Sequence, residues 1–351
     1  MWSNENRTNT PMLQAHVSSL VFPPLTLLSA RVRLRLLEAV HLPIFIGALL
    51  RGGFGYAFQR ASCPSACWGR AEQCAATLLC PYRWVFETPH PEGVTHLHDL
   101  RDVPRPFVLE PPPPTQRFYA ADTPLDFGLV LMGRGIDFLP YFLHGLAGFA
   151  AAGLGRDRTR ARLEHVAVVP AFAADGQLPR RSLPPDGAMI YEDGRVLNCA
   201  DLPLLNLAEL PNRAAALAAD LRLELLTPLR LKAQGALLDR LDLGVLVQAA
   251  CWRLNALATF HGHGPWTADY RPVVEAARRV RVEQSDLRWV DWERTSTRGG
   301  GQRSMKLGGL VGSVTLRGVP VEVRAALLAA ALLHVGKACV FGHGWLHLAH
   351  L

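Results

Sequence analysis

The sequence has very little lysine, so its positive charge comes almost entirely from arginine. Only Lys232, Lys306 and Lys337 are lysines among 37 cationic residues, which leaves 37 − 3 = 34 arginines. The net charge of +7 has two explanations in a chain this rich in arginine, alanine and leucine. It follows from codon bias in a GC-rich genome as readily as from a polyanionic partner. The placement of the charges is therefore more informative than their sum.

The sequence also lacks a long apolar run and a secretory leader. A membrane span needs roughly 18 uninterrupted apolar residues, and the best candidate, Val319 to Val335, is broken by Pro320, Glu322 and Arg324. The polar first ten residues lack the basic-then-apolar order of a signal peptide. We therefore expect a soluble, cytoplasmic protein with no membrane partner.

Several catalytic motifs are missing. We find no Ser-His-Asp order, no HExxH, no carboxylate cluster for a two-metal nuclease and no GxxxxGK[ST] phosphate loop. If the protein is a nuclease, metal-bound water is not the expected nucleophile. RNA offers another route, because its own 2′-OH can attack the adjacent phosphate. That route needs a general acid or base and cations near the phosphate.

What is present predicts two α+β domains. The chain has 351 residues, 49% of them hydrophobic, which excludes wholesale disorder and suggests two domains. Apolar alternation predicts a strand over 27–40 with a wet basic face formed by Arg31, Arg33 and Arg35, then a helix over 44–58 and a short strand over 82–87. From about residue 220 the order starts again.

Each half reads as strand-helix-strand-strand-helix-strand, which predicts tandem ferredoxin-like (RRM-like) βαββαβ domains. The predicted organisation is a polar leader (1–24), an N-terminal domain (25–215) with a Cys-rich insertion (61–82), and a C-terminal domain (216–351) with a basic hairpin and a glycine-rich loop.

Four of the seven cysteines lie close together in sequence. Cys63, Cys67, Cys74 and Cys80 fall within 18 residues, and four thiolates could close a tetrahedral structural zinc site. The spacing departs from two CxxC pairs, so buried, unligated cysteines are the alternative. No cofactor is expected for catalysis.

A glycine-rich segment follows the last predicted helix. It contains His334, Gly336, Lys337, Gly342, His343 and Gly344. Glycines allow backbone N–H groups to approach a polyanion, and a lysine adds a point charge on phosphate. The alternative is a tight corner between a helix and a strand.

A second segment, Arg294 to Arg317, contains cations and no acidic residue. Its cations include Arg294, Arg298, Arg303 and Lys306, and Gly299 to Gly301 form the tip of the predicted hairpin. Cations on such a ribbon can bind phosphates and reach base edges. An ordinary solvated hairpin would have the same composition.

Among 13 histidines, His41 stands out because it ends the first basic strand just before a helix. His261 and His263, in an HGHG run, are the next candidates. Any single histidine is more often structural or merely exposed than catalytic.

Taken together, several segments resemble the CRISPR-associated, repeat-processing endoribonucleases of the RAMP superfamily. The segments are Leu42-Pro43 with Gly47, Leu50 to Gly55, Cys80-Pro81-Tyr82, Pro104 to Phe107, Leu139 to Phe142, Thr227 to Lys232, Trp292 to Ser296, Leu307 to Gly312 and His334 to Gly344. Their order and combination make the match specific over most of the chain.

The resemblance implies a metal-independent enzyme that binds CRISPR repeat RNA and cuts precursor transcripts into guide RNAs (crRNAs), leaving a 2′,3′-cyclic phosphate. It implies His41 as general acid or base, with Arg51 or Lys337 stabilising phosphate charge, and RNA contacts from the glycine-rich segment and the hairpin. It also implies other CRISPR effector subunits as partners, with the enzyme retained on its product in an interference complex. A non-catalytic superfamily subunit that binds or caps guide RNA is the alternative.

Overall fold

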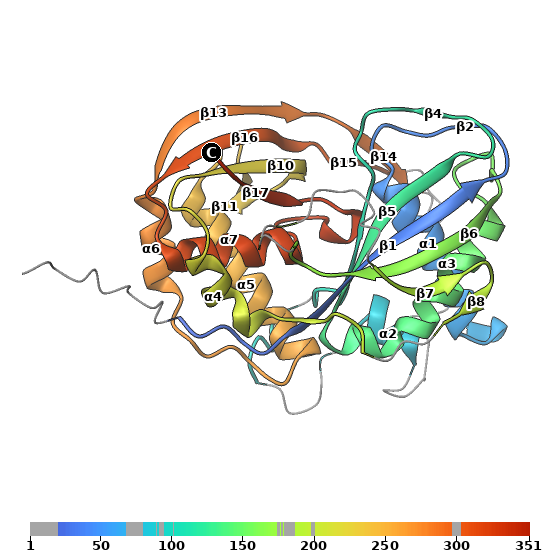
Figure 1. Ribbon diagram of the computed structural model, residues 1–351, viewed down its shortest axis with the longest axis horizontal. Coiled ribbons are helices and arrows are strands. Elements are labelled where there is room, and N and C mark those ends of the chain that lie inside the picture. The colour runs from blue at the N-terminus through green and yellow to red at the C-terminus, as the bar shows by residue number, and fades with distance from the viewer. Residues whose placement is uncertain are drawn as a thin grey trace, which may run out of the picture.

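Two antiparallel sheets lie side by side, each packed against helices (Figure 1). The computed structural model describes residues 20–67, 80–88, 90, 95–100, 102–173, 176, 178, 187–197, 201–296 and 303–351. Within these residues the protein is a mixed α/β molecule, with one sheet and one core built mainly from each half of the sequence.

The first sheet has the strand order β3-β5-β1-β6-β7-β8, and β9 also pairs with β1. Its strands are β1 (Thr26–Leu36), β3 (Phe107–Glu110), β5 (Pro124–Met132), β6 (Ala161–Val169), β7 (Ala188–Glu192), β8 (Arg195–Val196) and β9 (Leu205–Asn206). Helices α1 (Gly47–Ser62) and α3 (Leu139–Ala152) cover one face. The core between them is rich in phenylalanine, with Phe54, Phe58, Phe107 and Phe142 in mutual ring contact.

The second sheet has the order β13-β16-β10-β17. It consists of β10 (Leu221–Leu229), β13 (Arg281–Val290), β16 (Gly309–Arg317) and β17 (Leu346–His350), packed on α5 (Leu243–His261), α6 (Arg271–Arg278) and α7 (Val321–Leu333). In both sheets the first main strand, β1 or β10, is central and pairs antiparallel with the strands on either side.

Short elements join these layers. They are the pairs β2 (Val40–His41) with β4 (Phe118–Tyr119), β11 (Lys232–Ala233) with β12 (Ala236–Leu237), and β14 (Glu293–Ser296) with β15 (Arg303–Lys306), the helices α2 (Pro81–Phe86) and α4 (Leu210–Ala215), and the 3-10 turns η1 (Ser65–Cys67), η3 (Gly133–Phe138), η4 (Leu207–Glu209) and η5 (Cys339–Phe341). Although α4 precedes residue 216, it packs on α7 in the second core.

One sequence prediction of secondary structure is wrong, and one strand was not predicted. Residues 82–87 were expected as a strand, but Pro81–Phe86 is a helix with proline at its first turn, where a missing N–H costs nothing. The proline-dense segment before Pro111 contains β3, whose four residues are all buried. Four residues between prolines are too few to show a period.

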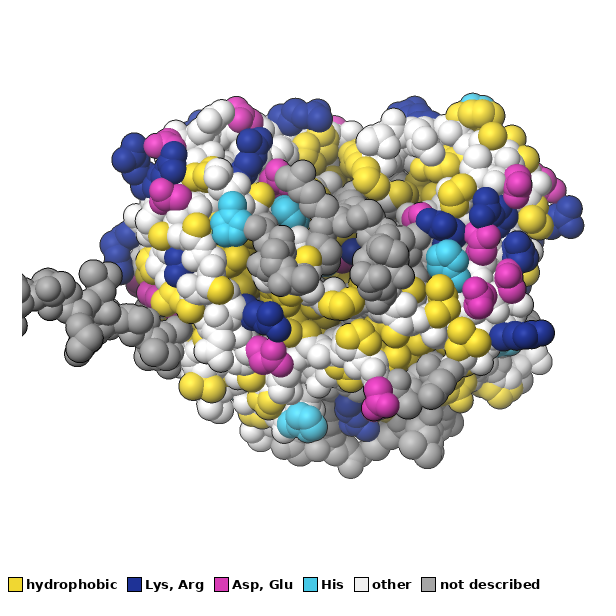
Figure 2. Space-filling model, in the orientation of Figure 1, with side chains coloured by type: hydrophobic (Ala, Val, Ile, Leu, Met, Phe, Trp, Pro, Cys, Tyr) yellow, Lys and Arg dark blue, Asp and Glu magenta, His cyan; other side chains and the backbone are white. Residues whose placement is uncertain are grey.

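The basic face of β1 is also different from the expectation, because its arginines are paired. Arg33 binds Asp126 through two hydrogen bonds of 2.7 and 2.8 Å, and Arg35 binds Glu164 at 2.8 and 2.9 Å. Over this sheet, at the right of Figure 2, cationic and anionic side chains lie beside one another. This face is therefore charge-compensated and is a poor polyanion surface.

Helix α5 is the one described helix whose length and composition would allow it to cross a membrane. However, 78% of the apolar 18-residue stretch of α5 is buried inside the protein. A core helix of a folded domain has the same properties, so α5 is weak support for a membrane span.

Candidate nucleic-acid interface

The segment before α1 carries the predicted catalytic histidine. His41 is exposed at the end of β2, and its ring packs on Phe118 of β4 at a centroid distance of 5.0 Å. Helix α1 begins six residues later. Its first turn contains no acidic residue and its N-cap, Ile46, provides no side-chain hydrogen bond. No carboxylate in the first turn of α1 therefore offsets the positive end of the helix dipole.

The start of α1 packs directly on the glycine-rich segment. A Cβ atom at Gly47 would overlap the backbone carbonyl of Phe341. One turn further along, the Arg51 guanidinium lies over the Phe86 ring at 5.1 Å and over the Phe341 ring at 5.9 Å. The fold therefore brings Arg51 and the glycine-rich segment together, although 290 residues separate Arg51 from Phe341 in sequence.

The glycines of this segment face the protein's own backbone. Gly336, Gly342 and Gly344 have φ of +92°, +79° and +66°, which side chains rarely adopt. Added Cβ atoms would overlap, respectively, the carbonyl of Arg230, the ring of Pro111 and the carbonyl of Val335. The tight-corner explanation therefore accounts for these three positions. Their predicted RNA contacts stay a prediction.

The lysine of the same segment, unlike its glycines, is exposed to solvent. Lys337 is exposed, and its backbone N–H donates to the Arg230 carbonyl at 3.0 Å. That hydrogen bond holds the backbone at Lys337, and the exposed side chain extends from it into solvent.

The two histidines of the segment are buried and hydrogen-bonded. His334 contacts the His343 carbonyl through Nδ1 at 3.0 Å and Glu110 through Nε2 at 3.5 Å, and Glu110 forms an ion pair with Arg31 at 2.5 Å. Burial raises the pKa of Glu110, but the charge of Arg31 and the contacts with His334 outweigh it and lower the pKa to about 2. This network joins β1 and β3 of the first sheet to the glycine-rich segment.

Burial also keeps two histidines neutral. It lowers the pKa of His343 to about 4, although the hydrogen bond to the Leu307 carbonyl opposes the shift. It lowers the pKa of His261 to about 4 as well, with Nε2 donating to the Pro104 carbonyl at 2.7 Å. His261 is only 1% exposed, so RNA cannot reach it without rearrangement. His263 is exposed and lies beyond the end of α5.

The base of the predicted basic hairpin is fixed on this junction. Trp292 stacks between Phe45 and His343, with centroids 5.4 Å from each ring. The N–H of Leu307 donates to the Trp292 carbonyl at 2.9 Å. In the β14–β15 ladder, Arg294 faces Met305, Arg303 faces Ser296, and Lys306 faces Glu293. Arg298 lies outside the described residues.

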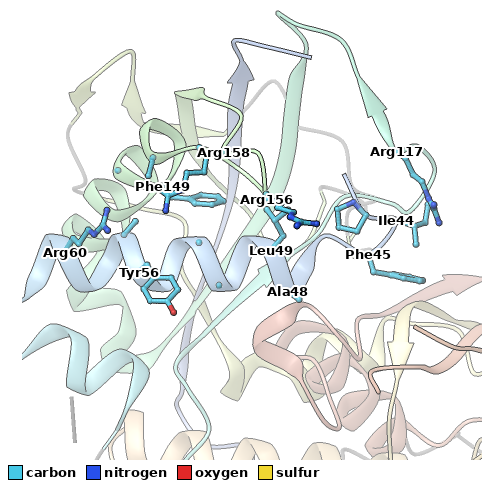
Figure 3. A pocket seen from close by; sticks show the side chains of 18 of the residues that line it. Ile44, Phe45, Ala48, Leu49, Tyr56, Arg60, Arg117, Phe149, Arg156 and Arg158 are labelled. Carbon is cyan, nitrogen blue, oxygen red and sulfur yellow. The ribbon is translucent and has the colours of Figure 1, made fainter. Parts of the chain in front are cut away.

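A groove of about 1000 Å³ opens beside this junction and follows α1. We call it the α1 groove. Its lining includes Phe45, Trp292 and Glu293 at one end, and it extends along α1 past Tyr56 to Arg60 (Figure 3). Arg117 and His144 also line the groove. The loop after α3 contributes Arg156 and Arg158.

None of these groove residues lies in either segment that the sequence assigned to RNA, although Trp292 and Glu293 belong to the 292–296 segment of the family resemblance. The only available signal was the Arg156-Asp157-Arg158 run between a helix and a strand. In an arginine-rich chain such a run is uninformative until the fold places it beside α1.

Three of the four predicted zinc ligands lie in the described residues. Cys63 follows α1, and its thiol pKa is raised to about 11 by burial and by the neighbouring Cys80 and Cys67. Cys74 lies outside the described residues. Among the residues that are described, no group of three or more His, Cys, Asp or Glu side chains is arranged to hold a metal ion. The zinc site stays a prediction.

Two family models match the chain. The model of an N-terminal domain, AF_1859_N, matches residues 25–195, and the model of the CRISPR-associated endoribonuclease Cas6 matches residues 223–346. The second match contains α5, the β14–β15 pair and the whole of the glycine-rich segment. No curated protein sequence matches the chain.

Solved structures match over nearly the whole chain. A partial Cas6-RT-Cas1–Cas2 complex has a TM-score of 0.56 at 15% identity over 94% of this chain. A Cas6 product complex has a TM-score of 0.53 at 17% identity, covering 92% of this chain and 99% of the other, and Thermus thermophilus Cas6 has 0.50 at 16%, covering 92% and 98%. The chain spans 46% of the first structure's chain and 29% of that in the fuller Cas6-RT-Cas1–Cas2 complex. At these identities the likeness shows the fold.

Proposed function

Because the chain belongs to the Cas6 group of RAMP-type, CRISPR repeat-processing proteins, we propose that it binds repeat RNA and cuts precursor transcripts into guide RNAs. Residues 223–346 carry the Cas6 endoribonuclease domain. The observation that carries the proposal is the packing of Gly47 on Phe341, which sets the start of α1 beside the glycine-rich segment, with the exposed His41 six residues upstream of Gly47 in the chain.

The proposed chemistry is a metal-independent transesterification within the RNA strand. A general base removes the proton of the 2′-OH, the 2′-oxygen bonds to the adjacent phosphorus, and the bond from phosphorus to the 5′-oxygen breaks. A general acid supplies a proton to that leaving oxygen. The products are a 2′,3′-cyclic phosphate and a 5′-hydroxyl.

His41 is the proposed acid or base, because an exposed imidazole is accessible to RNA and its ring nitrogens can accept or donate a proton. Arg51 and Lys337 are the proposed cations for the charge that develops on the phosphorane. The positive end of α1 adds to that field.

The strand order supports a finer proposal about the fold. In the first sheet β1 lies between β5 and β6, with β3 next to β5. In the second sheet β10 lies between β16 and β17, with β13 next to β16. A ferredoxin-like βαββαβ domain has the same strand order. We infer two such domains in tandem, and the Cys-rich segment as an insertion in the first.

A cleavage assay in EDTA tests the proposed function. The RNA that co-purifies with the protein identifies the repeat, and a labelled transcript with two copies of that repeat is the substrate. We expect cleavage in about 5 mM EDTA, a concentration that exceeds that of any bound divalent ion. The product ends should resist ligation until the cyclic phosphate is removed. Tight binding without product would instead indicate a non-catalytic subunit that binds or caps guide RNA.

The same preparation tests retention in an interference complex. If the enzyme stays on its product, the co-purifying RNA has one repeat-derived end and elutes with the protein at physiological salt. Release of the product after each cut would contradict this part of the proposal.

A further inference from the structure

The α1 groove extends well beyond the residues of the proposed chemistry. From Ala48 to Arg60 it follows 12 residues of helix, or roughly 18 Å at 1.5 Å per residue. One end lies at Phe45 and Trp292, beside the glycine-rich segment, and the other end lies at Arg60 (Figure 3). A strand that leaves the proposed cleavage site can therefore continue into it.

The lining between α1 and α3 is small and apolar. It includes Gly52, Gly53 and Ala57 of α1 with Gly148 and Ala152 of α3. At Gly53 a Cβ would overlap the ring of Phe149, so the two helices approach closely there. Together with Leu49 and Phe149, which also line the groove, these positions offer a largely apolar surface, which suits the face of a nucleobase.

An exposed aromatic ring lies along this surface. Tyr56 is 64% exposed and has no ring partner among the described residues. An unpaired base that stacks on an aromatic side chain contributes favourably to binding whatever its identity. Arg60 lies one turn further along the same helix, where it can reach the phosphate of a stacked nucleotide.

The loop after α3 supplies further cations from a constrained backbone. Leu154 and Thr159 exchange backbone hydrogen bonds of 2.8 and 3.0 Å, which close the loop, and Gly153 and Arg158 have φ of +90° and +51°. Arg156 and Arg158 are exposed, and neither forms an ion pair with a carboxylate in the described part of the chain. Asp157, between them, is not among the groove-lining residues.

The charge of the lining favours a polyanion. Four arginines line the groove, at positions 60, 117, 156 and 158, against one carboxylate, Glu293. The aromatic and apolar surface favours unpaired bases over a duplex, whose bases are already stacked. An acidic peptide would satisfy the arginines but would leave the exposed ring and the apolar lining without a partner.

We propose that the α1 groove binds the single-stranded RNA that flanks the cleavage site, with Tyr56 stacking on a base and Arg60, Arg156 and Arg158 binding phosphates. The inference rests on the proposed function for its placement next to a cleavage site. Its binding activity is measured separately from cleavage.

The test uses the full chain and a fluorescein-labelled oligouridine of 12 nucleotides (roughly the site size of single-strand binders). Tyr56→Ala should weaken binding by about 5-fold or more, and Tyr56→Phe should bind like the wild type, since both rings stack. Arg156→Gln with Arg158→Gln should lower the slope of log K against log salt by about 1.4, which is two phosphate contacts at about 0.7 each.

Matched variants separate the groove from general charge and from folding. Arg195→Gln with Arg240→Gln removes two exposed arginines that do not line the groove and should leave the salt slope unchanged. Gly148→Leu fills the groove from the exposed side of α3, where a Cβ meets only Ala57 at 3.9 Å. It should weaken oligouridine binding without lowering the melting temperature.

The outcomes are distinguishable from those of the cleavage assay. On a substrate trimmed to the repeat hairpin and its cut site, the groove variants should cleave at the wild-type rate. If the wild type binds oligouridine and the Tyr56, Arg156/Arg158 and Gly148 variants bind it equally well, the groove is not an RNA subsite, whatever the cleavage result. Groove-dependent binding without cleavage would support the subsite and contradict the endoribonuclease.

Discussion

Gly47 and Phe341 are in contact through the backbone, at the point where the first helix of one half meets the glycine-rich segment of the other. No side chain fits at Gly47, because a Cβ would overlap the Phe341 carbonyl oxygen. The contact fixes the position of the α1 N-terminus, with His41 upstream and Arg51 one turn downstream, relative to Lys337. The proposed chemistry depends on this one close approach.

Gly47→Ala should therefore damage both stability and cleavage. Relieving the overlap requires α1 and the loop to separate, so we expect a loss of about 1–3 kcal/mol in the free energy of unfolding. Cleavage should fall more than RNA binding does. Gly148→Ala is the matched control, since its Cβ has room; it should be neutral or stabilise by about 0.4–1 kcal/mol. Urea denaturation and single-turnover cleavage measure both effects.

His41→Ala should abolish most cleavage without loss of binding. Removal of a general acid or base costs about 10²- to 10⁴-fold in rate. Because His41 is exposed, its replacement should change stability by no more than about 0.5 kcal/mol.

His350→Ala, which removes another exposed histidine, provides the control and should cleave normally. Full activity of His41→Ala would remove His41 from the mechanism. His263 would then be the next candidate to replace, because it is exposed whereas His261 is buried.

Acid should destabilise the protein in a window set by two buried histidines. Burial lowers the pKa of His261 and of His343 from about 6.5 to about 4. Between these pH values the unfolded chain binds protons that the folded chain does not. The contribution of each histidine to the free energy of unfolding is therefore fully present above pH 6.5 and is lost as the pH drops toward 4. The loss is at most about 3 kcal/mol for each histidine (2.5 pKa units at about 1.36 kcal/mol each).

Protonation of Glu110 affects stability at a lower pH and therefore does not overlap with the measurement above pH 4.5. Its pKa is lowered to about 2 from an ordinary value of 4.5, so its contribution is complete above pH 4.5 and is lost as the pH falls through 2. His343→Gln should reduce the dependence of unfolding free energy on pH between 6.5 and 4.5 by about half. An unchanged slope would mean that His343 titrates normally in the folded protein.

The cysteine segment is expected to bind zinc. Purified protein should contain about one zinc ion per chain by mass spectrometry, and Cys63→Ser or Cys80→Ser should lower both the zinc content and the melting temperature. Cys251→Ser is the control, because Cys251 lies in the core of α5, away from the segment. Protein that is free of zinc and equally stable with or without a chelator would leave these cysteines as ordinary buried thiols.

The periodic elements could be predicted from sequence because their patterns are local. The strand predicted over 27–40 contains most of β1, and the helix predicted over 44–58 overlaps α1. Residues 81–86 and β3 could not be predicted, because six and four residues are too short for a period to distinguish helix from strand.

The candidate site was only partly predictable. Trp292 and the glycine-rich segment were recognised as separate motifs, but their contact through His343 joins residues 51 positions apart in sequence. The α1 groove was not predictable, because Tyr56, Arg117 and Arg156 belong to three different segments with no shared motif.

By itself, the sequence determined the two-part order of strands and helices, the resemblance to repeat-processing RAMP proteins, and which segments contain the glycines and cations. These follow from local periodicity and composition, which need no partner residue. Only the tertiary structure decided which arginines are available to RNA. Arg33 and Arg35 look basic in sequence but bind Asp126 and Glu164 across the sheet, whereas Arg156 and Arg158 remain exposed beside α1. Whether a charge is neutralised depends on neighbours that the chain brings together only when it folds.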